Sequence, residues 1–145
     1  MLNNGRLGLL MVGLMAFTWP TAAWGQNKAE LKPSPAAVVQ RQVDAYNAHD
    51  LPAFVSCYSD NAQTIDFGSS SVLEKNRSEL EKGFADFFKQ FPSVKCTIES
   101  RIVEGSYVID KELIEGMNGN KISGTVMYLV SDGKITKVWF LTPPR

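Results

Sequence analysis

Apolar side chains recur at a helical spacing in the first part of the chain. This spacing predicts an amphipathic helix over 35–48, a shorter helix capped by Asp50 that ends at 59–61, and a third helix that starts at Asn76 and ends at Pro92. The apolar stripe of the third helix consists of Leu80, Phe84, Phe87, Phe88 and Phe91. Phenylalanines at this spacing are typical of a helix face packed into a core, although one or two of them can also line a cavity.

Apolar and polar residues alternate after Pro92, which is the pattern of β-strands. Strands are expected near 94–104, 106–115, 121–131 and 134–141, with turns at Gly105-Ser106, 116–120 and Asp132-Gly133. A short strand pair, 63–67 and 72–74, is expected around a turn at 68–71. Helices followed by an antiparallel meander predict an α+β fold whose helices cover one face of the sheet.

The turn at Gly105-Ser106 fixes the register of the first long hairpin. It pairs Glu104 with Tyr107 and Arg101 with Asp110. One face then carries Cys96, Ile98, Ile102, Ile109 and Leu113, and the other carries Glu99, Arg101, Asp110 and Glu112. We therefore expect Arg101 and Asp110 to form a cross-strand ion pair on a polar sheet face.

The first 25 residues have the pattern of a cleavable secretory signal. A short polar start is followed by an apolar run over 7–17 and by the small residues of Ala23-Trp24-Gly25, after Pro20. This run is too short for a membrane anchor, because spanning a bilayer takes roughly 20 apolar residues. We expect a protein exported to the periplasm or the medium, with no membrane contact after cleavage. The expected segments are a signal at 1–25, a polar lead-in at 26–33 and one domain at 34–145.

Charge and composition exclude several classes of function. The chain has 15 basic and 15 acidic residues without a basic stripe, which argues against nucleic-acid binding. It has a single histidine and two distant cysteines, so no metal-ligand spacing is present. Neither a phosphate-binding glycine loop nor a nucleophile elbow occurs. We expect no metal and no cofactor.

The cysteines and the histidine have structural interpretations. Cys57 and Cys96 would reach an oxidising compartment, where they can form a disulfide or remain two buried thiols; the sequence leaves both alternatives open. His49 lies in the link between two helices and is expected to hold that link by hydrogen bonding.

Three segments resemble a known family. Residues 39–61, which include YNAHDLPAFVSCYSDN, look like the first two helices of SnoaL-like and ketosteroid-isomerase-like domains, and 100–116 and 132–141 resemble their sheet. These domains belong to the nuclear-transport-factor-2-like superfamily, whose fold is also called cystatin-like. The resemblance implies a cone: a curved antiparallel sheet wrapped around three helices, with a largely apolar cavity at the open end. Such folds serve as enzymes, binding proteins and dimerisation modules.

The resemblance to ketosteroid isomerase also implies site residues. Asp66 falls where that enzyme has its general base, and Tyr58 where a tyrosine supports the hydrogen bonds of the pocket. The strong oxyanion donors are not matched. Their positions, and that of a tyrosine on the third helix, fall on Gln42, on Thr125 or Val126, and on Phe84. The loss of one such donor typically costs about 2.7–4 kcal/mol of transition-state stabilisation.

Asp66 also stands out from its neighbours alone. It alternates with Ile65 and Phe67 just before the turn at 68–71. A carboxylate at the rim of an apolar cavity has a raised pKa and can act as a base. The alternative is a solvated strand-end aspartate that bonds the turn.

We therefore expect a protein that binds a small apolar molecule, or a weak enzyme that transfers a proton with Asp66 as base. The expected pocket residues are Tyr58, Phe84, Phe88, Met127 and Phe140. One alternative is a non-catalytic dimerisation or partner-binding module whose cavity is filled by its own side chains. The other is a hydrolase in which Asp66, Arg101 and Asp110 resemble the Asp–Arg–Asp set of some epoxide hydrolases of this fold.

The last hairpin predicts a homodimer. A turn at Asp132-Gly133 pairs Tyr128 with Lys137, and both faces of this hairpin are apolar. The family resemblance puts Val138 at a cavity-lining position, and therefore Tyr128 and Trp139 on the outer face. Exposed aromatic patches are typical of interface cores, so we expect two copies packed sheet to sheet.

Overall fold

Side chains cap all three helices found within residues 32–141, the part of the chain that the computed structural model describes. Ser34, Asp50 and Asn76 each accept a hydrogen bond from the backbone amide three residues further on. These bonds satisfy amides that a helix start leaves free. The helices are α1 (Pro35–Ala48), α2 (Leu51–Ser56) and α3 (Arg77–Gln90). Helix α2 ends earlier than the 59–61 expected, because Tyr58 already belongs to a strand.

The strands form one six-stranded sheet with the order β2-β1-β6-β5-β4-β3. They are β1 (Tyr58–Asp66), β2 (Ser71–Glu74), β3 (Lys95–Glu104), β4 (Tyr107–Met117), β5 (Asn120–Ser131) and β6 (Lys134–Leu141). All neighbouring strands run antiparallel except β1 and β6, which run parallel. The expectation of a wholly antiparallel sheet is wrong at this pair. Hairpins fix the direction of β3 to β6, whereas β1 meets β6 without a hairpin between them.

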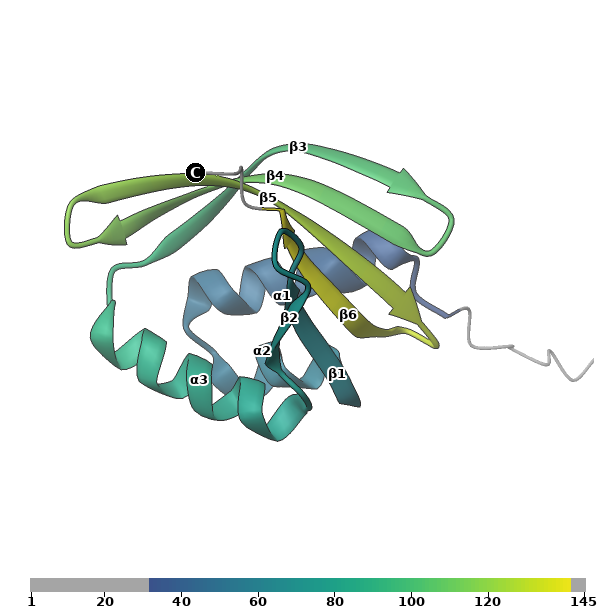
Figure 1. The fold of residues 1–145 in the computed structure, drawn as a ribbon. Coiled ribbons are helices and arrows are strands. Elements are labelled where there is room, and N and C mark those ends of the chain that lie inside the picture. The colour runs from purple at the N-terminus through teal and green to yellow at the C-terminus, as the bar shows by residue number, and fades with distance from the viewer. Residues whose placement is uncertain (1–31, 142–145) are drawn as a thin grey trace, which may run out of the picture. The chain divides into compact units, whose positions relative to one another are not determined.

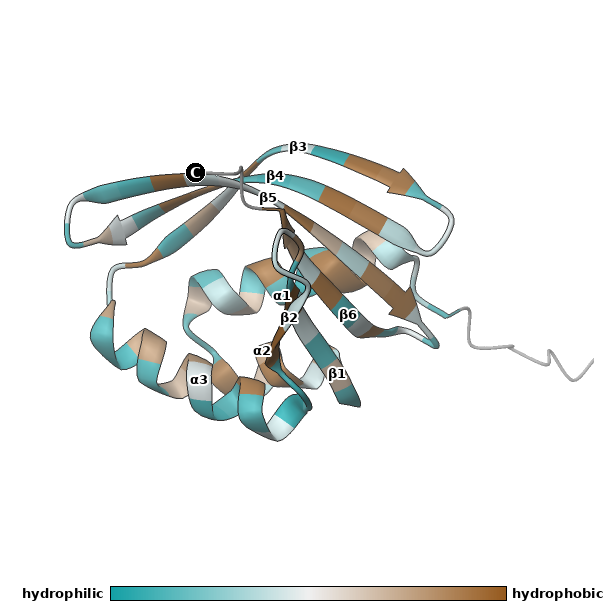
Figure 2. Ribbon diagram, in the orientation of Figure 1, coloured by the Kyte–Doolittle hydropathy of each residue, from teal (hydrophilic) through white to brown (hydrophobic). Residues whose placement is uncertain are grey.

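The sheet curves over the helices, which all lie on one side of it (Figure 1). Helix α1 lies beneath the middle strands, and α3 lies further from them, packed against α2, β1 and β2. Buried valines fill the layer between α1 and the sheet, among them Val38, Val39, Val108, Val126 and Val138. Apolar and polar positions alternate along the strands (Figure 2). The predicted α+β cone is confirmed.

The first long hairpin has the predicted register from its turn as far as Ser100, and over this part its two faces are the reverse of those expected. Glu104 pairs with Tyr107 and Arg101 with Asp110, as the two-residue turn requires. However, Asp110 is fully buried, whereas Ile102 is 62% exposed. The expected polar outer face is therefore the inner face, which α1 covers.

A β-bulge at Glu99 brings apolar and acidic side chains onto that inner face. Ile98 pairs with Glu112 and Ser100 with Lys111, so Glu99 is left without a partner in the ladder. The extra residue shifts the alternation by one position. As a result, the buried Glu112 and the half-buried Ile98 lie on the same side of the sheet.

A second irregularity changes the register of the last hairpin. The turn at Asp132-Gly133 forms as expected, with both residues at positive φ (52° and 74°). Next to it, Leu129 pairs with Lys137 and Val130 with Ile135, which leaves Thr136 over. The sequence pattern did not predict this one-residue change of register at Thr136.

Because of this shift, Tyr128 pairs with Val138 and not with Lys137. Tyr128 is 4% exposed and faces the helices, so its expected place on the outer face is wrong. Met127 pairs with Trp139, and both are partly exposed on the outer face.

The cysteines and the histidine have the roles of structural residues. Cys57 and Cys96 are free, buried thiols, so the disulfide alternative is not realised. His49 ends α1 and its Nε2 donates a 2.9 Å hydrogen bond to the Val94 carbonyl oxygen. Its ring stacks on Phe88, with centroids 5.0 Å apart. The predicted linking role of His49 is confirmed.

The expected signal at 1–25, and most of the lead-in at 26–33, lie outside the described residues. Between residues 32 and 141 there is no helix with both the length and the apolar character needed to cross a membrane.

Candidate functional site

A cavity of about 560 Å³ opens between the helices and the inner face of the sheet. Leu73 of β2 and Ile122 of β5 lie at its mouth, where they are 52% and 48% exposed. Cavities that hold small molecules commonly measure about 300–1,000 Å³. The side chains of residues 32–141 leave this space open, in contrast to the filled cavity of a purely structural module.

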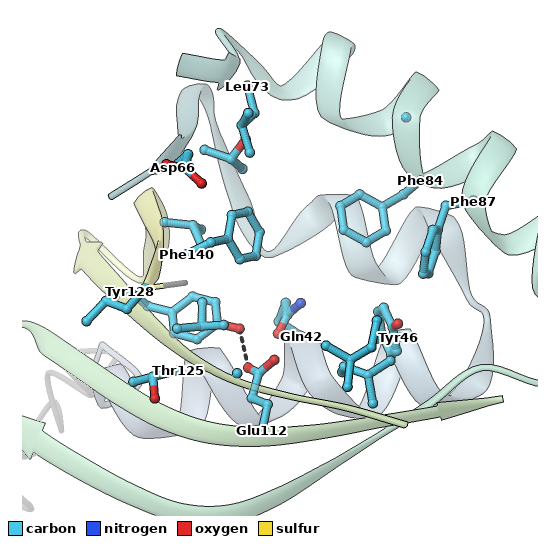
Figure 3. A pocket seen from close by; sticks show the side chains of 18 of the residues that line it. Gln42, Tyr46, Asp66, Leu73, Phe84, Phe87, Glu112, Thr125, Tyr128 and Phe140 are labelled. Carbon is cyan, nitrogen blue, oxygen red and sulfur yellow. Dashed lines mark hydrogen bonds between the residues drawn. The ribbon is translucent and has the colours of Figure 1, made fainter. Parts of the chain in front are cut away.

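Glu112 lies on the inner face of β4 at the deep end of this cavity (Figure 3). Its side chain accepts a 2.8 Å hydrogen bond at Oε1 from the Tyr128 hydroxyl. Burial raises the pKa of Glu112 to about 6, the hydrogen bond from Tyr128 opposes that rise, and the charge of Asp110 adds to it. A carboxyl group with this pKa can exchange a proton near neutral pH.

Two buried tyrosines, Tyr58 and Tyr128, also line the cavity. Burial raises the pKa of Tyr58 and of Tyr128 well above the ordinary phenol value. Both phenols therefore keep their protons over the physiological range.

Gln42 of α1 brings an unsatisfied acceptor to the cavity. Its residue is 6% exposed, and its Oε1 has no hydrogen-bond donor among residues 32–141. Buried polar atoms without partners are rare, and each costs about 1–3 kcal/mol. Gln42 lines the cavity (Figure 3), so this oxygen lies in the cavity wall without a donor among the described residues.

Gly124 explains why there is space above the Glu112 carboxyl group. The two residues are directly opposite each other on β5 and β4. Side chains at such positions point to the same face, about 4.5–5.5 Å apart. A Cβ added at Gly124 would meet no atom within 4 Å. The missing side chain therefore keeps open the part of the cavity opposite Glu112.

Aromatic rings form much of the wall. Phe84 and Phe87 of α3 each lie with their ring centroid 6.3 Å from that of Tyr46 on α1. Phe140 of β6 closes the opposite side (Figure 3). Apolar faces of this kind favour an apolar ligand body.

Asp66 lies at the rim, where it bonds a turn. Its Oδ1 accepts hydrogen bonds of 2.8 Å from both the amide and the hydroxyl group of Ser69. These bonds lower the pKa of Asp66, so the expectation of a raised pKa is wrong. Tyr58 lies at the other end of β1 and not beside Asp66. The solvated strand-end aspartate was the alternative for this residue, and the structure shows it.

The other expected pocket residues divide into two groups. Tyr58, Phe84 and Phe140 line the cavity, whereas Phe88 and Met127 are absent from its lining within the described part of the chain. Phe88 is covered by His49 and by neighbouring rings, because it lies on the core side of α3. Met127 points to the outer face, since the residues on both sides of it point inward.

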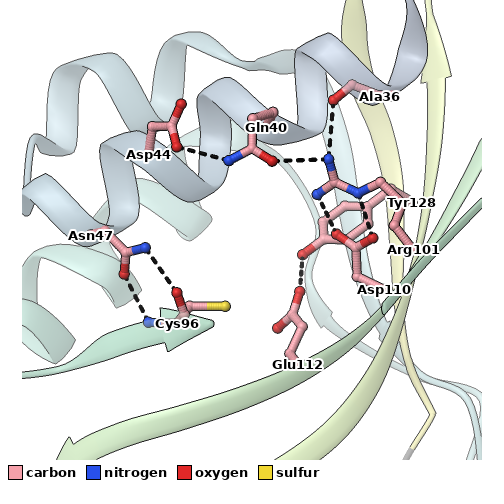
Figure 4. A network of polar contacts seen from close by, with 9 residues as sticks. All are labelled: Ala36, Gln40, Asp44, Asn47, Cys96, Arg101, Asp110, Glu112 and Tyr128. Atoms are coloured by element: carbon pink, nitrogen blue, oxygen red, sulfur yellow. Dashed lines mark hydrogen bonds and ion pairs between the residues drawn. The ribbon is translucent and has the colours of Figure 1, made fainter. Parts of the chain in front are cut away.

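Arg101 and Asp110 form a buried ion pair (Figure 4), and neither residue lines the cavity. Arg101 Nε and Nη2 contact the two Asp110 carboxylate oxygens at 2.7 Å each. The same guanidinium donates to Gln40 Oε1 of α1 at 3.0 Å. Asp66 lies elsewhere, at the rim. The hydrolase arrangement of Asp66, Arg101 and Asp110 is therefore not formed, and the expected solvated ion pair is in fact buried.

The sequence interpretation missed Glu112 and Tyr128 as site residues. It placed both on the outside of the sheet, because strict alternation was assumed through Glu99 and Thr136. The only available signal was the closeness of Asp110 and Glu112 to several apolar residues in one strand.

No group of three or more His, Cys, Asp or Glu side chains within 32–141 is arranged to hold a metal ion.

Comparisons with known proteins place the chain in a family. The family model of the SnoaL-like domain matches residues 39–138. No curated protein matches the chain.

Many solved structures share the fold. An uncharacterised cystatin-fold protein from Novosphingobium aromaticivorans is similar with a TM-score of 0.71 at 20% identity, over 76% of this chain and 99% of that one. An NTF2-like protein of unknown function from Cytophaga hutchinsonii gives 0.64 at 21%, over 80% and 96%. A proposed ketosteroid isomerase from Kribbella flavida gives 0.64 at 15%, over 77% and 78%. Identities this low establish the shared fold alone. Because the family model matches residues 39–138, which are most of the described residues, the chain belongs to the family of SnoaL-like domains.

Proposed function

We propose that this domain binds a small, largely apolar molecule in the cavity, with the polar end of the molecule against Gln42, Glu112 and Tyr128. The observation that carries this proposal is the open space above Glu112, at a floor where Gln42 Oε1 lacks a donor among the described residues. A protein that used this fold only as a scaffold would gain stability by filling the space. Apolar walls around a few polar groups are the usual composition of a ligand site.

Binding can be tested with Nile red, a neutral dye whose fluorescence rises in apolar surroundings. The full chain should bind one dye molecule per cavity. Gly124→Phe should abolish binding, because the ring would occupy the open space opposite Glu112. Gly124→Ala, which adds one methyl group in the same space, is the matched control and should bind within about threefold of the wild type. Equal binding by the wild type and Gly124→Phe would overturn the proposal.

Proton transfer is a second candidate function, and Glu112 replaces Asp66 as its base. The pKa of Glu112 is raised to about 6, whereas that of Asp66 is lowered. Apolar ketones incubated with the protein in D₂O should gain deuterium beside the carbonyl group, as detected by mass spectrometry. Glu112→Gln should abolish this exchange and Asp66→Asn should retain it. The reverse pattern would return the role of base to Asp66.

We also propose that the domain works outside the cytoplasm. The support is the signal pattern over 1–25, which ends in Ala23-Trp24-Gly25. N-terminal sequencing of the protein from its own host should start at Gln26 or within a few residues of it. An intact Met1 on protein in the cytoplasm would contradict export.

A further inference from the structure

We infer that the cavity is specific for an organic cation, an amine attached to an apolar body, whose ammonium group lies between Glu112 and Gln42. This inference rests on the proposed function and names the class of its ligand. It stands on the charge, the hydrogen-bonding groups and the rings of the cavity.

The charged side chains of the cavity wall all have the same sign. Asp66, Glu74 and Glu112 line it, and no lysine, arginine or histidine among residues 32–141 does. The nearby Arg101 is held by both oxygens of Asp110, so its charge is already paired. The field within a narrow apolar cavity is stronger than in water, because the surroundings screen it weakly. The cavity therefore attracts cations and repels anions.

The oxygen acceptors of Glu112 and Gln42, at the deep end of the cavity, favour a ligand that donates hydrogen bonds. Glu112 is an acceptor when it is ionised, and one of its oxygens is already bonded to Tyr128. Gln42 Oε1 is buried and lacks a donor among the described residues. Both side chains reach the same floor (Figure 3). An ammonium group carries up to three donors and can bond both oxygens, while a ketone or a carboxylate has no proton to give.

The rings add to this preference. Six aromatic side chains line the cavity: Tyr46, Tyr58, Phe84, Phe87, Tyr128 and Phe140. The face of an aromatic ring attracts a cation, by about 0.5–2 kcal/mol per contact depending on solvation. The same face repels an anion.

Three probes of similar size separate the possibilities: 2-phenylethylamine, 2-phenylethanol and 3-phenylpropionate, titrated into the full chain by calorimetry. At pH 8 the amine should bind at least tenfold more tightly than the alcohol, and the carboxylate more weakly than both. Equal affinities for amine and alcohol, or preference for the carboxylate, would overturn the inference. Nile red binding that is lost in Gly124→Phe would still support the proposed function in that case. If Nile red itself fails to bind, the proposed function fails and the inference fails with it.

The pH dependence provides a test on the unaltered protein. The groups facing Glu112 are Asp110 on its own strand, Cys96 and Arg101 of β3, Tyr128 of β5, Tyr46 of α1 and Tyr58 of β1. The pKa values of the cysteine and the three tyrosines are raised, so these groups stay neutral below pH 8. Glu112 loses its charge as the pH falls through about 6. Affinity for the amine should therefore fall about tenfold from pH 8 to pH 5, while that for the alcohol should change little. A rise in amine affinity on acidification would contradict the assignment.

Substitutions test whether Glu112 and Gln42, at the floor of the cavity, cause the preference for the amine. Glu112→Gln keeps the shape of the side chain, removes its charge and should reduce the amine preference to less than threefold. Gln42→Met removes the second acceptor and should weaken binding of the amine more than binding of the alcohol. Glu104→Gln, at an exposed glutamate of β3 that does not line the cavity, is the matched control and should preserve the preference. A preference lost in Glu74→Gln and kept in Glu112→Gln would place the cation at the mouth and overturn the inferred position.

Discussion

The hydroxyl group of Tyr128 donates a 2.8 Å hydrogen bond to Glu112 Oε1 across β5 and β4, and both residues are less than a tenth exposed. The bond holds one oxygen of the carboxyl group in place. It also stabilises the charged form, against the effect of burial. Tyr128 thus sets how readily Glu112 ionises.

Tyr128→Phe should raise the pKa of Glu112 further above about 6. A hydrogen bond to a charged group contributes about 1.5 kcal/mol, which corresponds to roughly one pKa unit. Titration of the ¹³C-labelled glutamate carboxyl group by NMR measures this shift. Tyr107→Phe, on the exposed end of β4, is the control and should leave the value unchanged. A Glu112 pKa that falls in Tyr128→Phe would contradict the role given to the bond.

Glu112 should make the protein less stable as the pH rises through about 4.5 to 6. Its pKa is raised from 4.5 to about 6 in the folded state, so the folded protein binds the proton more tightly than the unfolded chain. The stabilisation is therefore complete below pH 4.5 and is lost as the pH passes 6, by about 2 kcal/mol in total. Urea unfolding of the wild type and of Glu112→Gln at pH 4 and pH 7 isolates this contribution. An unchanged difference between the two proteins at both pH values would contradict it.

Asp66→Asn should weaken binding of the amine less than Glu112→Gln does. The carboxylate of Asp66 is committed to Ser69 in the turn after β1, away from the floor of the cavity. The substitution weakens the bonds to Ser69, so a small loss of thermal stability is expected. Calorimetric titration with the probe amine measures affinity. A loss of affinity as large as that in Glu112→Gln would restore Asp66 to the site.

Gly116→Ala should unfold or strongly destabilise the protein, while Gly119→Ala should be tolerated better. Both glycines have positive φ, 85° and 83°. A Cβ at Gly116 would lie 2.1 Å from the Ser93 carbonyl oxygen, whereas at Gly119 it would meet nothing within 4 Å. The strain common to both is about 1–2 kcal/mol, and only Gly116 adds a backbone clash. Chemical denaturation measures the free energy of unfolding of both variants. Equal losses of stability would show that the contact with the Ser93 carbonyl oxygen does not destabilise Gly116→Ala.

We propose that two copies of the chain associate through the outer face of the sheet. Trp139 and Met127 lie there, and Ile102 and Tyr107 are 62% and 42% exposed. Tyr128 no longer supports this idea, because it faces inward. Trp139→Glu should produce folded monomers in light scattering at micromolar concentration. A wild-type protein that is already monomeric under these conditions would end the proposal.

The sequence predicted most of the fold because each signal was local. The proline and capping residues at Ser34 and Asp50 located helix starts, and the turn at Gly105-Ser106 fixed a register. The parallel contact of β1 with β6 was missed, since it depends on tertiary packing between segments that no hairpin joins.

The site was harder to predict than the fold. A β-bulge adds one residue and reverses the faces beyond it, and neither Glu99 nor Thr136 carries a sequence signal for one. Glu112 and Tyr128 were consequently predicted to lie on the outer face of the sheet. Asp66 was favoured by family resemblance, although its neighbour Ser69 decides its chemistry.

The location of a bound ligand tests the central claim most directly. NMR shift mapping of the isotope-labelled full chain, titrated with 2-phenylethylamine, reports which amides respond. We predict that the largest changes occur at Gln42, Glu112 and Gly124, and that they disappear in Gly124→Phe. Changes concentrated around Trp139 on the outer face, with the amides of the cavity floor unaffected, would contradict the account.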